Sequence, residues 1–302
     1  MGQEAKKSLK TRLALKSSLA RETLAEFVAT FVLIVLGCGC VAQAVLSRGV
    51  AGNVVTINIG FALAVTMAVY VAGGVSGGHV NPAISLAMCA TGRMDWCKFP
   101  LYVCAQMLGA TAGAAAIFGI YYDAFMSFAD GNLAVSGPNA TAHIFATYPA
   151  PFLSITNGFA EQVASTALLV ISVFAIFDTR NKGAPHGLEP VAVGLLIFLL
   201  GCSLGMNSGC AMNPARDLGP RMFTAVAGWG LEVFSAGNNW WWVPVVAPMV
   251  GGIIGAYIYV LSIEIHHQSE TEDTEQDGDT YGKYELTNSA DIHLGSSETS
   301  CA

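Results

Sequence analysis

The chain carries one eight-residue pattern twice, as Ser76-Gly-Gly-His-Val-Asn-Pro-Ala83 and as Ser208-Gly-Cys-Ala-Met-Asn-Pro-Ala215. Asparagine is a strong helix N-cap, and proline is favoured at the first helical position, where its missing N–H has no helical partner. Each Asn-Pro-Ala tripeptide therefore predicts the beginning of a helix. At about 1.5 Å per residue, the segments that follow, 83–92 and 215–227, cover only about half of a bilayer.

The two halves of the chain are also alike upstream of these tripeptides. Glu26-Phe-Val-Ala-Thr30 in the first half aligns with Gln162-Val-Ala-Ser-Thr166 in the second. Each half contains three long apolar stretches, an odd number, so the second half enters the membrane upside down relative to the first. Such inverted repeats place the working site near the middle of the bilayer. We therefore predict two short helices, one from each side, whose N-termini meet there.

Composition supports a membrane protein. Hydrophobic residues make up 53% of the 302 residues and charged residues only 12%, whereas soluble domains carry about 25% charged residues. Six apolar stretches approach the roughly 20 residues that one helical span needs. The predicted fold is an all-α membrane protein with six transmembrane helices plus two re-entrant half-helices in an inverted 3+3 repeat. The predicted spans are Phe27–Leu46, Val54–Gly74, Phe99–Tyr122, Gln162–Phe177, Val191–Met206 and Trp240–Ile263, and the fourth and fifth of these need their flanks.

The charges predict orientation and boundaries. Basic residues before the first stretch put the N-terminus in the cytoplasm by the positive-inside rule, and six crossings return the C-terminus to the same side. The net charge of −7 comes from the polar C-terminal tail, which we expect to be disordered. The expected parts are a cytoplasmic segment 1–21, a first repeat 22–124, an extracellular loop 125–157, a second repeat 158–263 and an acidic cytoplasmic tail 264–302.

The glycine-rich segments before the two tripeptides suggest a pore. Extended backbone cannot face lipid, because its carbonyls would be unpaired, but it is tolerated where it lines water. We expect a ladder of carbonyl acceptors that ends at the amides of the two asparagines. The ladder is formed by Gly77, Gly78, His79, Asn207, Ser208 and Gly209, and the two tripeptides are Asn81, Pro82, Ala83 and Asn213, Pro214, Ala215.

Positive charge at the centre of such a pore disfavours cations and protons. Two helix N-termini converging on the midplane place partial positive charge where a cation has to pass. Arg216, directly after the second tripeptide, adds a full charge toward the outer mouth. An ionisable residue inside a membrane is a functional candidate, and the alternative for Arg216 is an interfacial arginine that snorkels.

With these motifs the chain resembles the aquaporins, or major intrinsic proteins, over about residues 21–267. The resemblance is carried by the two repeated patterns, by Asn213-Pro-Ala-Arg-Asp217 and by Gly187-Leu-Glu-Pro190. In Asp217 the chain resembles the glycerol-conducting branch of this family, the aquaglyceroporins, which typically have an aspartate after the arginine. The resemblance implies a homotetramer in the plasma membrane that passes water, glycerol, urea and other small neutral solutes passively and excludes ions.

The resemblance also implies which residues form the narrowest part of the pore, called the selectivity ring below. Arg216 matches the arginine of the family motif, Phe61 falls at the aromatic position, Gly201 stands where water-only channels have histidine, and Cys210 completes the ring. Glycine in place of histidine widens the ring, and Phe61 offers an apolar wall opposite Arg216. Without the alignment, Phe61 could equally be an ordinary lipid-facing aromatic.

Several polar residues are expected to support the pore. Glu26 matches the buried acid that in this family braces a half-helix loop by accepting backbone N–H bonds, and Asp217 is a further support. In the second half of the chain, Gln162 is at the position equivalent to Glu26, and Glu161 lies beside it. Either residue could therefore brace the second loop. We expect a structural hydrogen bond from His79, with pH sensing as the alternative. The sequon at Asn139 is a glycosylation candidate.

The remaining residue types argue against other functions. The eight cysteines have neither a disulfide framework nor a metal-binding spacing, so we expect free thiols, no metal and no cofactor. The sequence offers no catalytic motif or phosphate loop, so we expect neither an enzyme nor a nucleic-acid partner. A coupled transporter normally needs intramembrane acids along its path, and only Glu26, Glu161 and Asp217 are available. A water-selective pore is the nearer alternative.

Overall fold

The computed structural model describes residues 14–267. These residues are largely helical, and their only β pairing is an isolated bridge between Ala134 and Ala140. Contacts divide the chain into the units Met1–Tyr259 and Val260–Ala302. In the second unit the structure describes the end of α11 and the short 3-10 helix η3 (Glu264–His266). The basic residues before position 14 and the acidic tail beyond position 267 lie outside the described residues.

Within the described residues, five apolar helical segments are long enough to cross a membrane. They contain α2 (Ser18–Leu46), α3 (Val54–Ser76), α5 (Phe99–Ile120), α7 (Ile155–Phe177) and α11 (Val243–Ser262). The sixth span, α8 (Glu189–Leu204), has 16 residues and is therefore about 24 Å long, less than the roughly 30 Å of a hydrocarbon core. Helix α2 begins well before the predicted Phe27, because Ser17 caps a polar first turn that apolar patterning misses.

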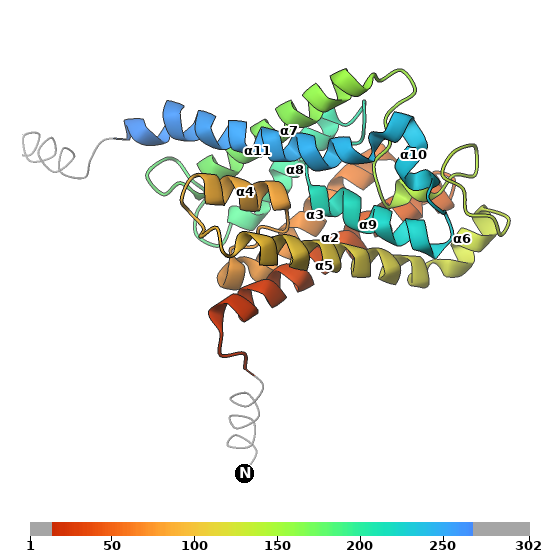
Figure 1. Cartoon of the computed structure of the whole chain (residues 1–302), viewed down its shortest axis with the longest axis horizontal. Helices are drawn as coiled ribbons and strands as arrows, with labels where there is room; N and C mark the ends of the chain where they lie inside the picture. The colour runs from red at the N-terminus through yellow and green to blue at the C-terminus, as the bar shows by residue number, and fades with distance from the viewer. Residues whose placement is uncertain (1–13, 268–302) are drawn as a thin grey trace, which may run out of the picture. The chain divides into compact units, whose positions relative to one another are not determined.

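Two short helices begin at the prolines of the repeated pattern. Helix α4 (Pro82–Ala90) is capped by Asn81, and α9 (Pro214–Ala227) is capped by Asn213. Figure 1 shows them following one another in the space between α5 and α11. Helix α4 contacts α5, α7 and α9. The arrangement matches the aquaporin fold that the sequence predicted.

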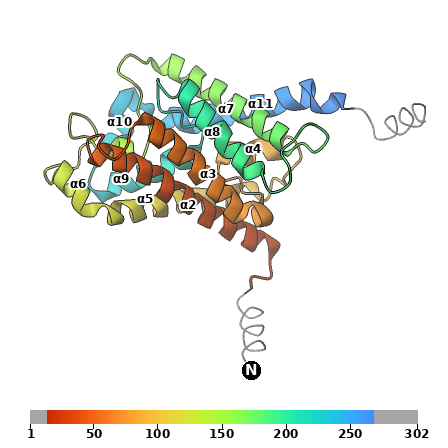
Figure 2. The same cartoon turned by 180° about the vertical axis from the view of Figure 1, so that it is seen from behind.

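The long helices of the first unit approach one another closely at glycines. Helix α2 packs against α3 and α5, α3 also contacts α8, and α7 contacts α8 (Figures 1 and 2). A Cβ on Gly109 of α5 would lie 2.4 Å from the carbonyl oxygen of Phe27 on α2, and a Cβ on Gly251 of α11 would lie 2.3 Å from that of Val163 on α7. Small residues at such crossings let helix backbones approach in a membrane.

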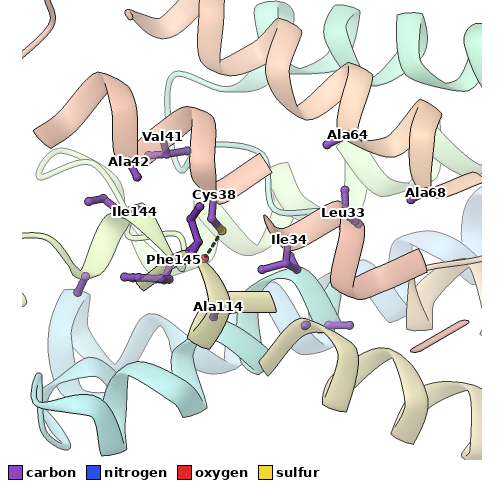
Figure 3. Close-up of a cluster of buried hydrophobic side chains, with 14 of the residues drawn as sticks. Leu33, Ile34, Cys38, Val41, Ala42, Ala64, Ala68, Ala114, Ile144 and Phe145 are labelled. Carbon is purple, nitrogen blue, oxygen red and sulfur yellow. Dashed lines mark hydrogen bonds between the residues drawn. The ribbon is translucent and has the colours of Figure 1, made fainter. Parts of the chain in front are cut away.

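The segment expected as an external loop, 125–157, is partly buried. It contains the end of α6 (Tyr122–Phe128) and the 3-10 helix η1 (Ala142–Ile144). Ile144 and Phe145 have no exposed surface and lie against α2 at Cys38, whose thiol is 3.7 Å from the Phe145 carbonyl oxygen (Figure 3). Sequence patterning missed this packing because the segment has no helical period.

The predicted last span, Trp240–Ile263, begins with a 3-10 turn and follows a break in the helix. Helix α10 (Glu232–Asn239) and the 3-10 turn η2 (Trp240–Trp242) precede α11. The cause is local, because Gly237, Asn238 and Asn239 all have positive φ angles. Glycine and asparagine are the residues that adopt this left-handed conformation most readily.

Candidate functional site

The N-termini of the two half-helices are tied together crosswise. The side-chain amide of Asn81 donates to the carbonyl of Met212 (2.9 Å), and that of Asn213 donates to the carbonyl of Val80 (2.8 Å). The Oδ1 atoms of the same asparagines cap their own helices, through the N–H groups of Ala83 (2.9 Å) and of Ala215 and Arg216. An amide has two N–H donors, so each asparagine keeps one for a passing solute.

The loops that lead into the half-helices are strained. Val80 has φ 46°, Cys210 has φ 55° and Met212 has φ 49°. A positive φ is an outlier for a branched residue such as valine, and each such residue costs about 1–3 kcal/mol. Surrounding contacts must therefore hold both loops in place.

Glu26 supplies the contacts for the first loop. Its fully buried carboxylate accepts hydrogen bonds from the backbone N–H of His79 (2.9 Å) and of Val80 (2.7 Å). It also accepts from the hydroxyl of Ser76 (2.6 Å) and the amide of Gln106 (2.8 Å). Four donors around one carboxylate offset the cost of burying its charge.

Gln162 takes the equivalent place in the second loop. Its Oε1 accepts from the backbone N–H of Met212 (3.0 Å), and its Nε2 donates to the hydroxyl of Ser208 (2.8 Å). Glu161 reaches the loop only through Ser208, whose hydroxyl donates to its Oε2 (2.8 Å). Of the two residues that the sequence left open, Gln162 is therefore the one that holds the backbone.

The four residues expected in the selectivity ring line one cavity of about 1240 Å³. The guanidinium carbon of Arg216 lies 4.6 Å from the centre of the Phe61 ring, and Arg216 Nη1 donates to the carbonyl of Phe145 (2.8 Å). Gly201 leaves its part of the wall without a side chain. The thiol of Cys210 turns toward the carbonyl of Leu200 (3.8 Å), and Cys210 is 8% exposed.

The residues expected in the carbonyl ladder differ in their contact with the cavity. Gly77, Gly78, His79, Ser208 and Gly209 line the cavity. Asn207 is outside the lining, and its carbonyl accepts a hydrogen bond from the backbone N–H of Ala150 (2.8 Å). The carbonyl of Asn207 therefore anchors the segment before α7 to the chain before the second half-helix, and its place in the ladder stays a prediction.

Sequence reasoning missed a buried network beside the ring. Arg221 forms an ion pair with Asp217 and donates to the carbonyls of Val233 and Thr147. Asp217 accepts from the backbone N–H of Thr147 (2.7 Å). This network fixes the loop whose Phe145 carbonyl holds Arg216. An arginine four residues after an aspartate in a membrane-embedded segment was the available signal.

Two titratable groups of this loop line the cavity. Burial raises the pKa of Tyr148 to about 12, and desolvation lowers the pKa of His143. Both side chains are therefore neutral at pH 7. Arg216 remains the charged side chain of the ring.

His79 and Asn139 have clear surroundings. The Nδ1 of His79 is 3.1 Å from the hydroxyl of Ser85, and its ring packs on Tyr102, which fits the structural interpretation. Asn139 is half-buried, and the hydroxyl of Thr141 in the same sequon accepts from the indole of Trp229 (3.0 Å). Residues 14–267 contain seven free cysteines and no group of side chains placed to bind a metal ion.

Comparison with known proteins agrees with this geometry. The family model described as MIP, major intrinsic protein, matches residues 14–259. The chain is 68% identical to aquaporin-9 of Homo sapiens over 95% of this chain and 98% of that protein. It is 55% identical to aquaporin-10 of Homo sapiens over 86% of each. The solved structure of the aquaglyceroporin from Plasmodium falciparum has a TM-score of 0.73 and 32% identity, and the match covers 80% of this chain and 95% of that one. The chain belongs to the major intrinsic protein family.

Proposed function

We propose that this protein is a passive membrane channel for water, glycerol and other small uncharged solutes such as urea. One observation carries the proposal. Two asparagine-capped helix N-termini are bonded to each other beside a cavity lined by backbone from both repeats. Asparagine N–H groups and backbone carbonyls offer a neutral solute replacements for its hydration shell.

The same geometry disfavours ions and protons. Each half-helix directs the positive end of its dipole at the asparagine pair, and Arg216 adds a full charge at the ring. Desolvating a cation costs far more than desolvating a neutral molecule, and the only acid among the described residues that line the cavity is Glu189, at the start of α8. Glu26 is fully buried behind its loop and already accepts four hydrogen bonds.

The selectivity ring offers glycerol both an apolar surface and hydrogen-bond donors. Gly201 removes a side chain from one side, Phe61 offers an apolar surface to C–H groups, and Arg216 offers donors to hydroxyl oxygens. Family membership further supports a homotetramer in the plasma membrane with both termini in the cytoplasm. Glycosylation at Asn139, in the loop expected outside, belongs to the same proposal.

Stopped-flow light scattering on proteoliposomes tests the function. In a glycerol gradient, vesicles with the protein should shrink and then reswell quickly, whereas empty vesicles reswell slowly. Shrinkage without fast reswelling would identify a water-only pore. Flux that requires a proton or sodium gradient, or an ionic current through the reconstituted protein, would contradict a passive channel for neutral solutes.

A further inference from the structure

Asn58 lies on the pore-lining face of α3, one turn before Phe61. Residues three apart on a helix share a face and are about 4.5 Å apart along the axis. Both residues line the same cavity. Because α3 begins on the side expected to be extracellular, Asn58 stands at the outer edge of the selectivity ring.

The amide of Asn58 lies where a ring side chain at position 201 would begin. A Cβ built on Gly201 would be 2.8 Å from Asn58 Oδ1 and 3.0 Å from its Cγ. Real Cβ atoms do not approach other atoms this closely, so a side chain at 201 and the present position of this amide exclude each other. The missing side chain of Gly201 therefore leaves space that Asn58 uses.

The hydrogen-bonding capacity of this amide is largely unused by the protein. Its Nδ2 lies 3.7 Å from the sulfur of Cys202, and sulfur is a weak acceptor. None of the described residues donates a hydrogen bond to its Oδ1. An amide oxygen with two lone pairs thus faces the cavity beside the ring.

We propose that Asn58 is a specificity-determining residue, whose Oδ1 accepts hydrogen bonds from solute N–H and O–H groups at the ring. This inference rests on the proposed channel function and adds a polar acceptor to the side of the ring that Gly201 leaves bare. Arg216 is the donor of the ring. A solute with both donors and an acceptor, such as urea, can bond to Asn58 and Arg216 at once.

The test compares urea and water permeability in the same proteoliposomes for Asn58→Ala, Asn58→Leu and the control Ile59→Ala. Ile59 is next on α3, outside the cavity lining. Losing one hydrogen bond to a desolvated solute should lower the ratio of urea to water permeability about threefold to tenfold in both Asn58 variants. The control should keep the wild-type ratio, and retained water permeability shows that the variants are folded.

Alanine separates hydrogen bonding from bulk, because it removes the acceptor and also opens space, whereas leucine removes the acceptor and is larger than asparagine. If Asn58 acts only by filling space, Asn58→Ala raises the ratio of urea to water permeability while the larger Asn58→Leu lowers it, and a raised ratio in Asn58→Ala overturns the proposal. Failure of the wild-type protein to conduct glycerol or urea refutes the channel function instead, so the two failures are distinguishable.

Gly201→Ala provides an independent measurement. Its Cβ displaces the Asn58 amide, so it should also lower the urea-to-water ratio. If both substitutions act through the same oxygen, the double variant with Asn58→Ala shows little further loss, since effects at one shared contact do not add. Additive losses would contradict the role of Asn58 Oδ1.

Discussion

Arg221 and Asp217 form an ion pair, 2.8 Å from Nη2 to Oδ1, in which neither side chain is exposed to solvent. The two residues are one turn apart on α9, and both bind Thr147 of the loop between α6 and α7. The same loop presents the Phe145 carbonyl to Arg216. The ion pair on the second half-helix therefore helps to hold Arg216 in its place in the selectivity ring.

Replacing Arg221 with methionine should destabilise the protein strongly. The change leaves the carboxylate of Asp217 buried without its cation, and breaking a buried pair in this way costs about 3–5 kcal/mol. Thermal unfolding of the purified protein in detergent should show a markedly lower melting temperature. Lys182→Met, at an exposed position of the loop between α7 and α8, is the control and should melt like the wild type. Equal melting of both variants would show that the pair contributes nothing.

Replacing Gln162 with glutamate should also destabilise the protein. Gln162 Nε2 lies 3.3 Å from Glu161 Oε1 and donates to Ser208. A carboxylate there would face the carboxylate of Glu161, and the single hydroxyl proton of Ser208 can serve only one of them. We expect a loss on the order of 1–3 kcal/mol.

The double variant Glu161→Ala with Gln162→Glu is the matched test of this explanation. It removes the like charge while keeping the new acid, which can still accept from the Met212 N–H. Its melting temperature should lie above that of Gln162→Glu alone. If the double variant is no more stable than the single one, repulsion from Glu161 is not the cause.

Mercury compounds should act at Cys202 rather than at Cys210. The family resemblance implies a place for Cys210 in the ring, but its thiol is buried and points at the carbonyl of Leu200. Cys202 is exposed and lines the same cavity next to Asn58. Glycerol flux of Cys202→Ser vesicles should resist mercury, whereas Cys210→Ser should be blocked like the wild type. The opposite pattern would mean that the Cys210 thiol faces the pore.

The repeated pattern predicted the centre of the site because its signals are local. Asparagine is a strong N-cap and proline is favoured at the first helical position, and inversion of the halves brings the two helix starts together. The polar contacts around that centre were harder to predict, because they join segments far apart in sequence. Arg221 binds Thr147, and Asn58 lies against Gly201 and Cys202. Nothing local in residues 140–150 shows that their backbone folds inward to the ring.

The apolar side of the selectivity ring depends on Gly37, a residue that sequence patterning does not single out. A Cβ on Gly37 of α2 would lie 2.4 Å from Cε1 of Phe61, and two more ring atoms are within 3.0 Å. The aromatic ring therefore rests directly on the backbone of α2. Phe61 can take this position in the cavity only because residue 37 has no side chain.

Gly37→Ala should consequently push the Phe61 ring into the cavity and narrow it. A methyl group here overpacks a tight site, which costs about 1–3 kcal/mol. The aromatic ring of Phe61 can relieve the overlap by moving toward the cavity, whereas the backbone of α2 cannot move easily. We expect glycerol permeability to fall by about tenfold, which adds about 1.4 kcal/mol to the barrier, and water permeability to fall much less. Gly39→Ala is the control on the same helix, where the new Cβ would meet Ile117 at 3.2 Å, away from the ring. Equal losses of water and glycerol in Gly37→Ala, or the same selective loss in Gly39→Ala, would show that Phe61 does not set the aperture.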